Sequence, residues 1–118
     1  MKYRITLTEQ QAKVVAEACE FFARVRCGQF AEIRWKTLDL SLPVDDYCER
    51  RDRMDAILLA ARAEAYPELH GAGHSYGLGK FEDADIAFDV YQVIRAVFGD
   101  PRGAWSVREL PTCDEIEE

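Results

Sequence analysis

The apolar residues at the two ends of the chain alternate with polar ones. Tyr3, Ile5 and Leu7 are separated by single polar residues, which is the pattern of a half-buried strand. Residues 105–109 alternate in the same way, beginning at Trp105. We expect these two segments to be strands that pair with each other.

Between these segments the apolar residues recur at helical spacing. A helix is predicted to begin after Thr8, because Thr8 and Gln11 have the spacing of a capping box, in which each side chain accepts a backbone N–H from the other residue. Its predicted apolar face consists of Val15, Ala18, Phe22 and Val25. Gly28 disfavours a continuous helix by about 1 kcal/mol relative to alanine, so we expect a kink or a short break there.

A second long helix is predicted between two prolines. Pro43 suits the first turn of a helix, and Tyr66 is its expected end because the residue before Pro67 avoids helical angles. The predicted buried face consists of Tyr47, Met54, Ile57, Leu58, Ala61 and Ala65.

A third helix is predicted from Asp83, as its cap, through Phe98. It is apolar on nearly every side, so we expect it at the centre of the fold. Its polar stripe consists of Asp85, Asp89 and Gln92, with Arg95 at the edge, and these groups need partners or must face a cavity.

Together these elements predict an α+β fold, mostly helical, with three main helices and a small two-stranded sheet formed by the N- and C-terminal strands. The chain has 118 residues, of which 48% are hydrophobic, and this is the usual size of one domain, here residues 1–118. We expect the acidic tail, residues 112–118, to be frayed.

The net charge and the cysteine content restrict the classes of binding partner and the cellular compartment that we expect for this protein. A formal charge of −7 repels nucleic-acid phosphates, so direct nucleic-acid binding is not expected. No apolar run approaches the roughly 20 residues of a membrane-spanning helix, so we expect no membrane partner. The four cysteines form no C-x-x-C pair and no secretory leader opens the chain, which indicates a cytosolic protein.

The sequence offers no catalytic or metal-binding signature. His70 and His74 lie four residues apart in the glycine-rich segment 67–80, but without paired cysteines they are better interpreted as exposed loop residues than as zinc ligands. The run that ends at Lys80 has glycines and a lysine, yet it lacks the following Ser or Thr of a nucleotide-hydrolysing phosphate loop. We therefore expect no enzyme activity, no metal and no cofactor.

Non-catalytic binding of a phosphate is the remaining chemistry that the glycine-rich loop suggests. Successive glycines can turn backbone amides toward an anion, and nearby cations can add charge. The candidate ligand-binding residues are Arg24, Gln29, Ser75, Tyr76, Gly77, Lys80, Gln92 and Arg95. The alternatives are a merely flexible loop and, for Gln29, Asp89, Gln92 and Arg95, a hydrogen-bonded network of the core.

Several blocks of the chain resemble a family of small uncharacterised proteins of bacteriophages and prophages. The blocks are Leu7–Ala12, Phe22–Val25 followed by Gly28-Gln29-Phe30 and Ile33, Ser75-Tyr76-Gly77, and Tyr91–Arg95. The resemblance implies a phage accessory protein of the host cytoplasm, in a class where non-enzymatic inhibitors of bacterial immunity are common.

Two functions follow from the residues and the resemblance together. The first is sequestration of a nucleotide immune signal in a pocket built from the glycine-rich loop and the third helix. The alternative is an acidic protein inhibitor, with a host defence protein as its partner, that blocks a nucleic-acid-handling effector such as a CRISPR nuclease. The sequence is compatible with a homo-oligomer in either case.

Overall fold

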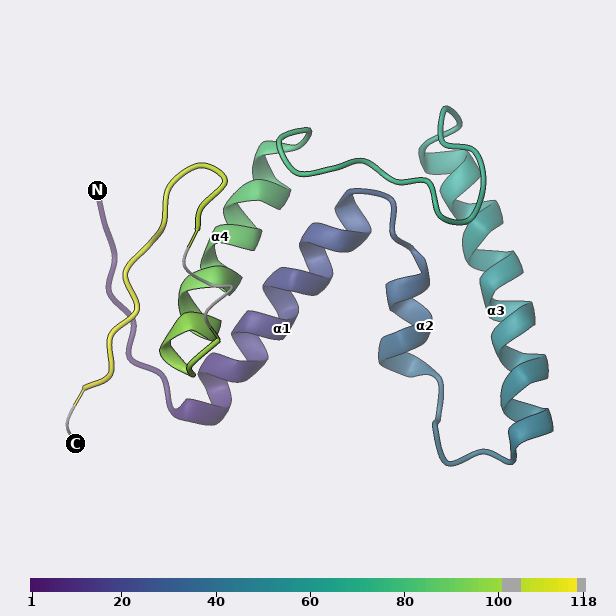
Figure 1. Cartoon of the computed structure of the whole chain (residues 1–118), viewed down its shortest axis with the longest axis horizontal. Helices are drawn as coiled ribbons and strands as arrows, with labels where there is room; N and C mark the ends of the chain where they lie inside the picture. Colours follow the sequence, from purple (N-terminus) through teal and green to yellow (C-terminus); the bar gives the residue numbers. More distant parts are fainter. Residues whose placement is uncertain (101–104, 117–118) are drawn as a thin grey trace. The chain divides into compact units, whose positions relative to one another are not determined.

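A computed structural model describes residues 1–100 and 105–116, and it contains four helices in these ranges. They are α1 (Glu9–Arg26), α2 (Ala31–Thr37), α3 (Val44–Ala65) and α4 (Glu82–Val97), as Figure 1 shows. Two compact units can be distinguished, one formed by Met1–Ala23 with Leu78–Glu118 and the other by Arg24–Gly77. We call them the terminal unit and the middle unit. The single domain predicted for residues 1–118 stays a prediction.

The predicted two-stranded sheet is absent from the described residues, so the α+β fold class is wrong and the described chain is all-helical. Tyr3 and Ile5 are exposed and belong to no strand. In the other segment, the backbone N–H groups of Val107, Arg108 and Glu109 all donate to the Asp89 carboxylate. The Asp89 carboxylate therefore accepts the backbone N–H groups with which this segment would have paired to a neighbouring strand. The last two residues of the tail, 117–118, lie outside the described residues.

In the terminal unit, α1 begins as predicted. The Thr8 backbone N–H donates to Gln11 Oε1 at 2.9 Å, and the Gln11 backbone N–H donates to Thr8 Oγ1 at 3.1 Å, which completes the capping box. The predicted apolar face is wrong in part, because Phe22 is 44% exposed while Ala16 and Ala23 are buried. The buried stripe of α1 thus consists of small residues seven positions apart.

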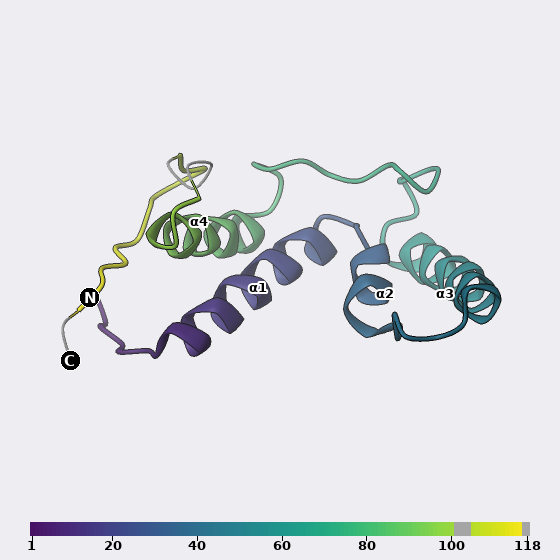
Figure 2. The same ribbon diagram turned by 60° about the horizontal axis from the view of Figure 1, so that its bottom comes forward.

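Helix α4 buries a polar stripe. Asp85, Asp89 and Gln92 are each at most 1% exposed, whereas the apolar Ile86 is 51% exposed. They lie four and three positions apart, so they share one face of the helix. The expectation that this polar stripe needs partners is therefore confirmed, because all three side chains form hydrogen bonds. Figures 1 and 2 show α4 and the segment that follows it, and Asp89 and Gln92 are the residues that hold this segment.

Ile94 is a buried apolar residue of α4 in the terminal unit. We expect Ile94→Val to lower the free energy of unfolding by about 1 kcal/mol, because a methyl group is removed from a side chain that is only 5% exposed. Ile86→Val is the matched control on the same helix, and we expect a change within about 0.5 kcal/mol. Urea unfolding of both variants measures this, and equal midpoints would contradict the assignment of Ile94 to the core.

The break predicted at Gly28 is confirmed in the middle unit. Gly28 has a φ of 96°, its backbone N–H donates to the Val25 carbonyl, and the Gln29 N–H donates to the Arg24 carbonyl. These two bonds form a Schellman motif, the usual end of a helix at a glycine. Helix α2 is consequently a separate short helix.

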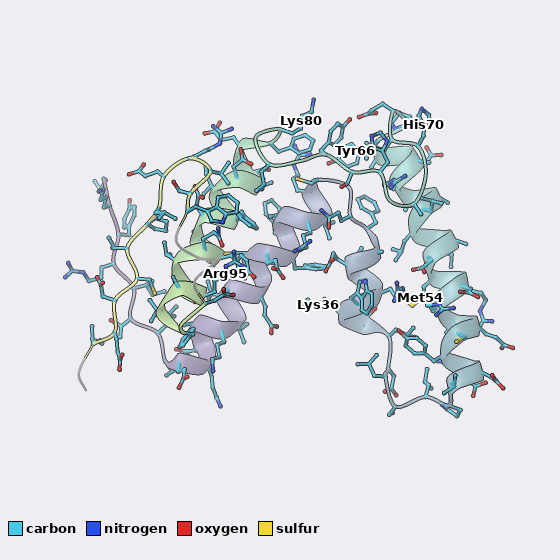
Figure 3. All side chains as sticks on the ribbon, viewed as in Figure 1. Lys36, Met54, Tyr66, His70, Lys80 and Arg95 are labelled. Carbon is cyan, nitrogen blue, oxygen red and sulfur yellow. The ribbon has the colours of Figure 1, made fainter. Side chains whose placement is uncertain are left out.

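Helix α3 packs beside α2, and its last residue is Ala65, with the predicted end, Tyr66, as its C-cap. The predicted apolar face is wrong in part, because Ile57 is 67% exposed and Ala61 and Ala65 are also exposed, whereas Tyr47, Met54 and Leu58 are half-buried. The buried residue of this helix is Arg62. Met54 of α3 lies between the two helices in Figure 3. Apolar side chains are distributed around α3, so polar contacts of Arg62 decide which side is buried.

None of the described helices is long and apolar enough to cross a membrane.

Candidate functional site

The middle unit has a cavity of about 680 Å³. Its wall is formed by the start of α2, one side of α3 and the loop that follows α3. The lining residues on the α2 side are Gly28, Gln29, Phe30, Ala31, Glu32 and Arg34. Those on α3 are Asp55, Ala56, Leu58, Leu59 and Arg62, and the loop contributes Ala72, Gly73, His74 and Ser75. The volume is within the range of small-molecule binding sites.

Arg62 is the most unusual group in this wall. It is 4% exposed, and its two terminal nitrogens donate to the His74 carbonyl at 2.7 Å and to the Gly71 carbonyl at 2.6 Å. Its Nε is buried and has no hydrogen-bond partner, and no carboxylate of the described chain pairs with the guanidinium. Two neutral carbonyls orient the guanidinium but do not balance its charge.

A second buried arginine of the wall is already neutralised. Arg34 of α2 donates from Nε to Asp55 Oδ1 of α3 at 2.6 Å, and it is 8% exposed. The Arg34 guanidinium also lies over the Trp35 ring, 4.5 Å from the ring centroid. This ion pair joins α2 to α3. Arg62 is therefore the arginine of the cavity wall whose charge no carboxylate balances.

The predicted site residues that reach the cavity are Gln29 and Ser75. Arg24 lies directly behind Gln29, because Arg24 Nη1 donates to Gln29 Oε1 at 3.1 Å. Of the predicted residues of the middle unit, Gln29 and Ser75 therefore line the cavity, and Arg24 is bonded to one of them. The amide nitrogen of Gln29 is the part of that side chain that can donate to a ligand.

Tyr76 and Gly77 of the same loop have structural contacts instead. The Tyr76 backbone N–H donates to the Cys27 carbonyl, and its hydroxyl donates to Glu68 Oε1. The hydrogen bond to the Glu68 carboxylate, with some burial, raises the pKa of Tyr76 to about 12. Gly77 offers its carbonyl to the Cys27 thiol. These contacts fix the loop after Ser75.

The other predicted site residues, Lys80, Gln92 and Arg95, belong to the terminal unit. Figure 3 shows Lys80 just before α4 and Arg95 near the far end of that helix. Thirteen residues of helix separate Glu82 from Arg95, which is about 20 Å at the helical rise. Lys80 and Arg95 therefore lie near opposite ends of α4, and the pocket of loop and third helix stays a prediction.

Arg95 and Gln92 have contacts within the terminal unit. Arg95 Nη1 donates to the Tyr91 hydroxyl at 2.9 Å, lies over the Tyr91 ring, and is 3.8 Å from Asp100 Oδ2. Gln92 Nε2 donates to the Trp105 carbonyl at 3.2 Å. Both residues thus serve local structure around the end of α4.

Asp85 and Asp89 complete a polar cluster with Gln92, the α4 clasp. Asp89 accepts the three backbone N–H groups at 2.7, 2.9 and 3.0 Å. Asp85 accepts the Arg108 Nε–H at 2.9 Å through one oxygen and the Gly79 backbone N–H at 2.8 Å through the other. Asp89 and Gln92 are therefore bonded within the terminal unit, whereas Gln29, which was expected in the same network, is bonded to Arg24 of the middle unit.

His70 and His74 are joined to each other. The His70 backbone N–H donates to His74 Nδ1 at 3.1 Å, so Nδ1 is an acceptor and is not available as a metal ligand in this arrangement. The described residues include no group of three or more His, Cys, Asp or Glu side chains placed to hold a metal ion. That no metal or cofactor is needed stays a prediction.

Sequence reasoning missed Arg34 and Arg62, the two buried arginines of the cavity wall. Asp55, Leu58 and Arg62 are three and four residues apart, so they share one face of α3. That spacing was visible in the sequence, but arginine is rarely buried and usually lies on the solvent side of a helix.

No family model, no curated protein and no solved structure matches this chain.

Proposed function

We propose that this protein binds a small nucleotide without transforming it, and that the cavity of the middle unit is the binding site. The observation that carries the proposal is the Arg62 guanidinium, which is buried, lines the cavity and has no carboxylate partner in the described chain. A buried charge without a counter-charge is unfavourable, so a bound anion would be stabilised there.

The geometry around Arg62 suits a phosphate. Two of its five N–H donors bind the His74 and Gly71 carbonyls, which leaves three for oxygen acceptors. Guanidinium groups bind phosphate oxygens with two parallel hydrogen bonds. The Ser75 hydroxyl and the Gln29 amide, in the same wall, are further donors for such a ligand.

The arrangement favours binding over catalysis. Ser75 and His74 are adjacent in the wall, but no hydrogen bond joins the hydroxyl to the imidazole, and His74 Nδ1 accepts the His70 backbone N–H. A serine nucleophile needs a base within hydrogen-bond reach. We therefore propose that the protein binds its ligand without catalysing a reaction.

The biological setting is proposed from the resemblance alone: a phage accessory protein in the host cytoplasm that sequesters a nucleotide immune signal. The acidic-inhibitor alternative has less support from the surface of α3. Its exposed acidic residues Asp45, Asp46, Glu49 and Asp52 are interspersed with exposed Arg50 and Arg53. A mimic of nucleic acid needs a uniformly negative face.

The test is a substitution of Arg62. We expect Arg62→Gln to weaken binding of adenosine nucleotides at least tenfold, measured by isothermal titration calorimetry, because an ionic hydrogen bond to phosphate is worth about 1.5 to 3 kcal/mol. Arg53→Gln removes an exposed guanidinium from the same helix and serves as the matched control, with unchanged affinity expected.

A second variant separates binding from folding, because Arg62 also holds the loop. Arg62→Lys keeps the charge and can still donate to a loop carbonyl, yet it loses the planar fork that fits phosphate. We expect a folded protein, as judged by circular dichroism, with weakened binding. Wild-type affinity in a folded Arg62→Gln protein would exclude this cavity as the site.

A further inference from the structure

The charges in the cavity wall can be counted. Four ionised side chains line the cavity: Arg34, Arg62, Asp55 and Glu32. Arg34 and Asp55 neutralise each other at 2.6 Å, so the wall offers one unbalanced cation and one carboxylate. A ligand with many negative charges would gain one attraction at Arg62 and meet repulsion from Glu32, which lies half-buried in the same wall.

Apolar side chains also line the cavity. Phe30, Leu58 and Leu59 line it together with three alanines, Ala31, Ala56 and Ala72. The Phe30 ring is held edge-on to Tyr66, with centroids 6.4 Å apart, and the Tyr66 hydroxyl is in turn bonded to Arg26. An aromatic ring fixed in this way can stack on a nucleobase, whatever the base.

From these charges and apolar side chains we infer that the cavity selects a nucleotide with a singly charged phosphodiester, such as a cyclic nucleotide, over a nucleoside triphosphate. This inference rests on the proposed function. The phosphodiester would lie at Arg62 and the base against Phe30. One negative charge balances the one unpaired guanidinium, whereas a phosphomonoester already carries about −1.5 to −2 at neutral pH.

Nucleic acid also contains phosphodiesters, and two features argue against it. A cavity of about 680 Å³ has room for one small molecule and not for a strand. The formal charge of the chain is −7, which opposes the approach of a polyanion. A single-stranded oligonucleotide is therefore a suitable negative probe.

The experiment compares four ligands on the full chain by calorimetry at 0.15 M salt without magnesium: 3′,5′-cyclic AMP, AMP, ATP and a single-stranded hexathymidylate. We expect the cyclic nucleotide to bind at least tenfold more tightly than ATP, AMP to lie between them, and the hexanucleotide not to bind. Glu32→Gln should raise the affinity for ATP about threefold or more and leave that for the cyclic nucleotide within twofold.

The outcomes separate the two proposals. If none of the four ligands binds, or if a folded Arg62→Gln protein binds them as the wild type does, the proposed function itself is wrong. If nucleotides bind through Arg62 but ATP binds as tightly as the cyclic nucleotide, the function stands and the selection for a phosphodiester is wrong. Tight binding of the hexanucleotide would also overturn the inference, in favour of a nucleic-acid strand.

Discussion

Asp89→Ala should lower the free energy of unfolding of the terminal unit by about 3 kcal/mol. The carboxylate is 1% exposed and accepts three consecutive backbone N–H groups, from Val107 to Glu109. Each hydrogen bond to a charged group contributes about 1.5 to 3 kcal/mol, and water can replace part of this because the segment lies at the surface.

Trp105 allows this change to be measured. Its carbonyl is bound by Gln92 and its ring lies 5.5 Å from the Phe88 ring, so its fluorescence reports whether the segment stays on α4. The measurement is urea unfolding in a Trp35→Phe background, which removes the other tryptophan of the chain. Faster hydrogen exchange at residues 107–109 is the second expected result.

Glu82→Ala is the control for Asp89→Ala. Glu82 is an exposed carboxylate on the same helix, and we expect a loss below about 1 kcal/mol, from its interaction with the helix dipole alone. If Asp89→Ala and Glu82→Ala unfold at the same urea concentration, the α4 clasp does not hold the segment.

The positions of the helices could be predicted from the sequence because their signals are local. The Thr8–Gln11 capping box, Gly28, and the prolines at positions 43 and 67 act on the backbone next to them. Each of the predicted helix ends at these residues is confirmed. Such signals do not depend on what packs against the helix.

The buried faces could not be predicted, because here they depend on long-range polar contacts. Arg62 is buried by carbonyls of a loop that follows it, and Asp89 by amides about twenty residues further along. The rule that places arginine at the surface assigns Arg62 to solvent. Asp89 was expected to need a partner, but the sequence did not indicate which one. The same contacts explain why the predicted sheet is absent from the described residues. Residues 105–109 alternate as a strand does, but the backbone N–H groups of residues 107–109 donate to the Asp89 carboxylate and not to a neighbouring strand.

The candidate site was predicted in part for the same reason. Gln29 and Ser75 were identified because of an amide on an apolar face and a glycine-rich loop, and both line the cavity. Lys80 was chosen as part of the glycine-rich loop and Arg95 as the edge of the polar stripe of the third helix, but Lys80 precedes α4 and Arg95 lies in its last turn. A charge in the sequence indicates a binding site only when the fold leaves it unbalanced.

Gly28→Ala should destabilise the middle unit by about 2 to 3 kcal/mol. A left-handed backbone conformation costs an alanine about 1 to 2 kcal/mol, and Gly28 has a φ of 96°. An added Cβ would also stand 2.7 Å from Leu69 Cδ1, and Leu69 is buried, so the neighbouring side chain must move.

Gly71→Ala has the first of these effects alone, so the difference between the two variants measures the second. Gly71 lies in the same unit with a φ of 80°, and nothing lies within 4 Å of its added Cβ. We expect it to cost only the backbone contribution, about 1 kcal/mol. Urea unfolding followed by Trp35 fluorescence, in a Trp105→Phe background, measures both variants. Equal losses would show that the Leu69 side chain moves away at no cost, and the cavity lining at Gly28-Gln29-Phe30 would then be less closely packed than its contacts indicate.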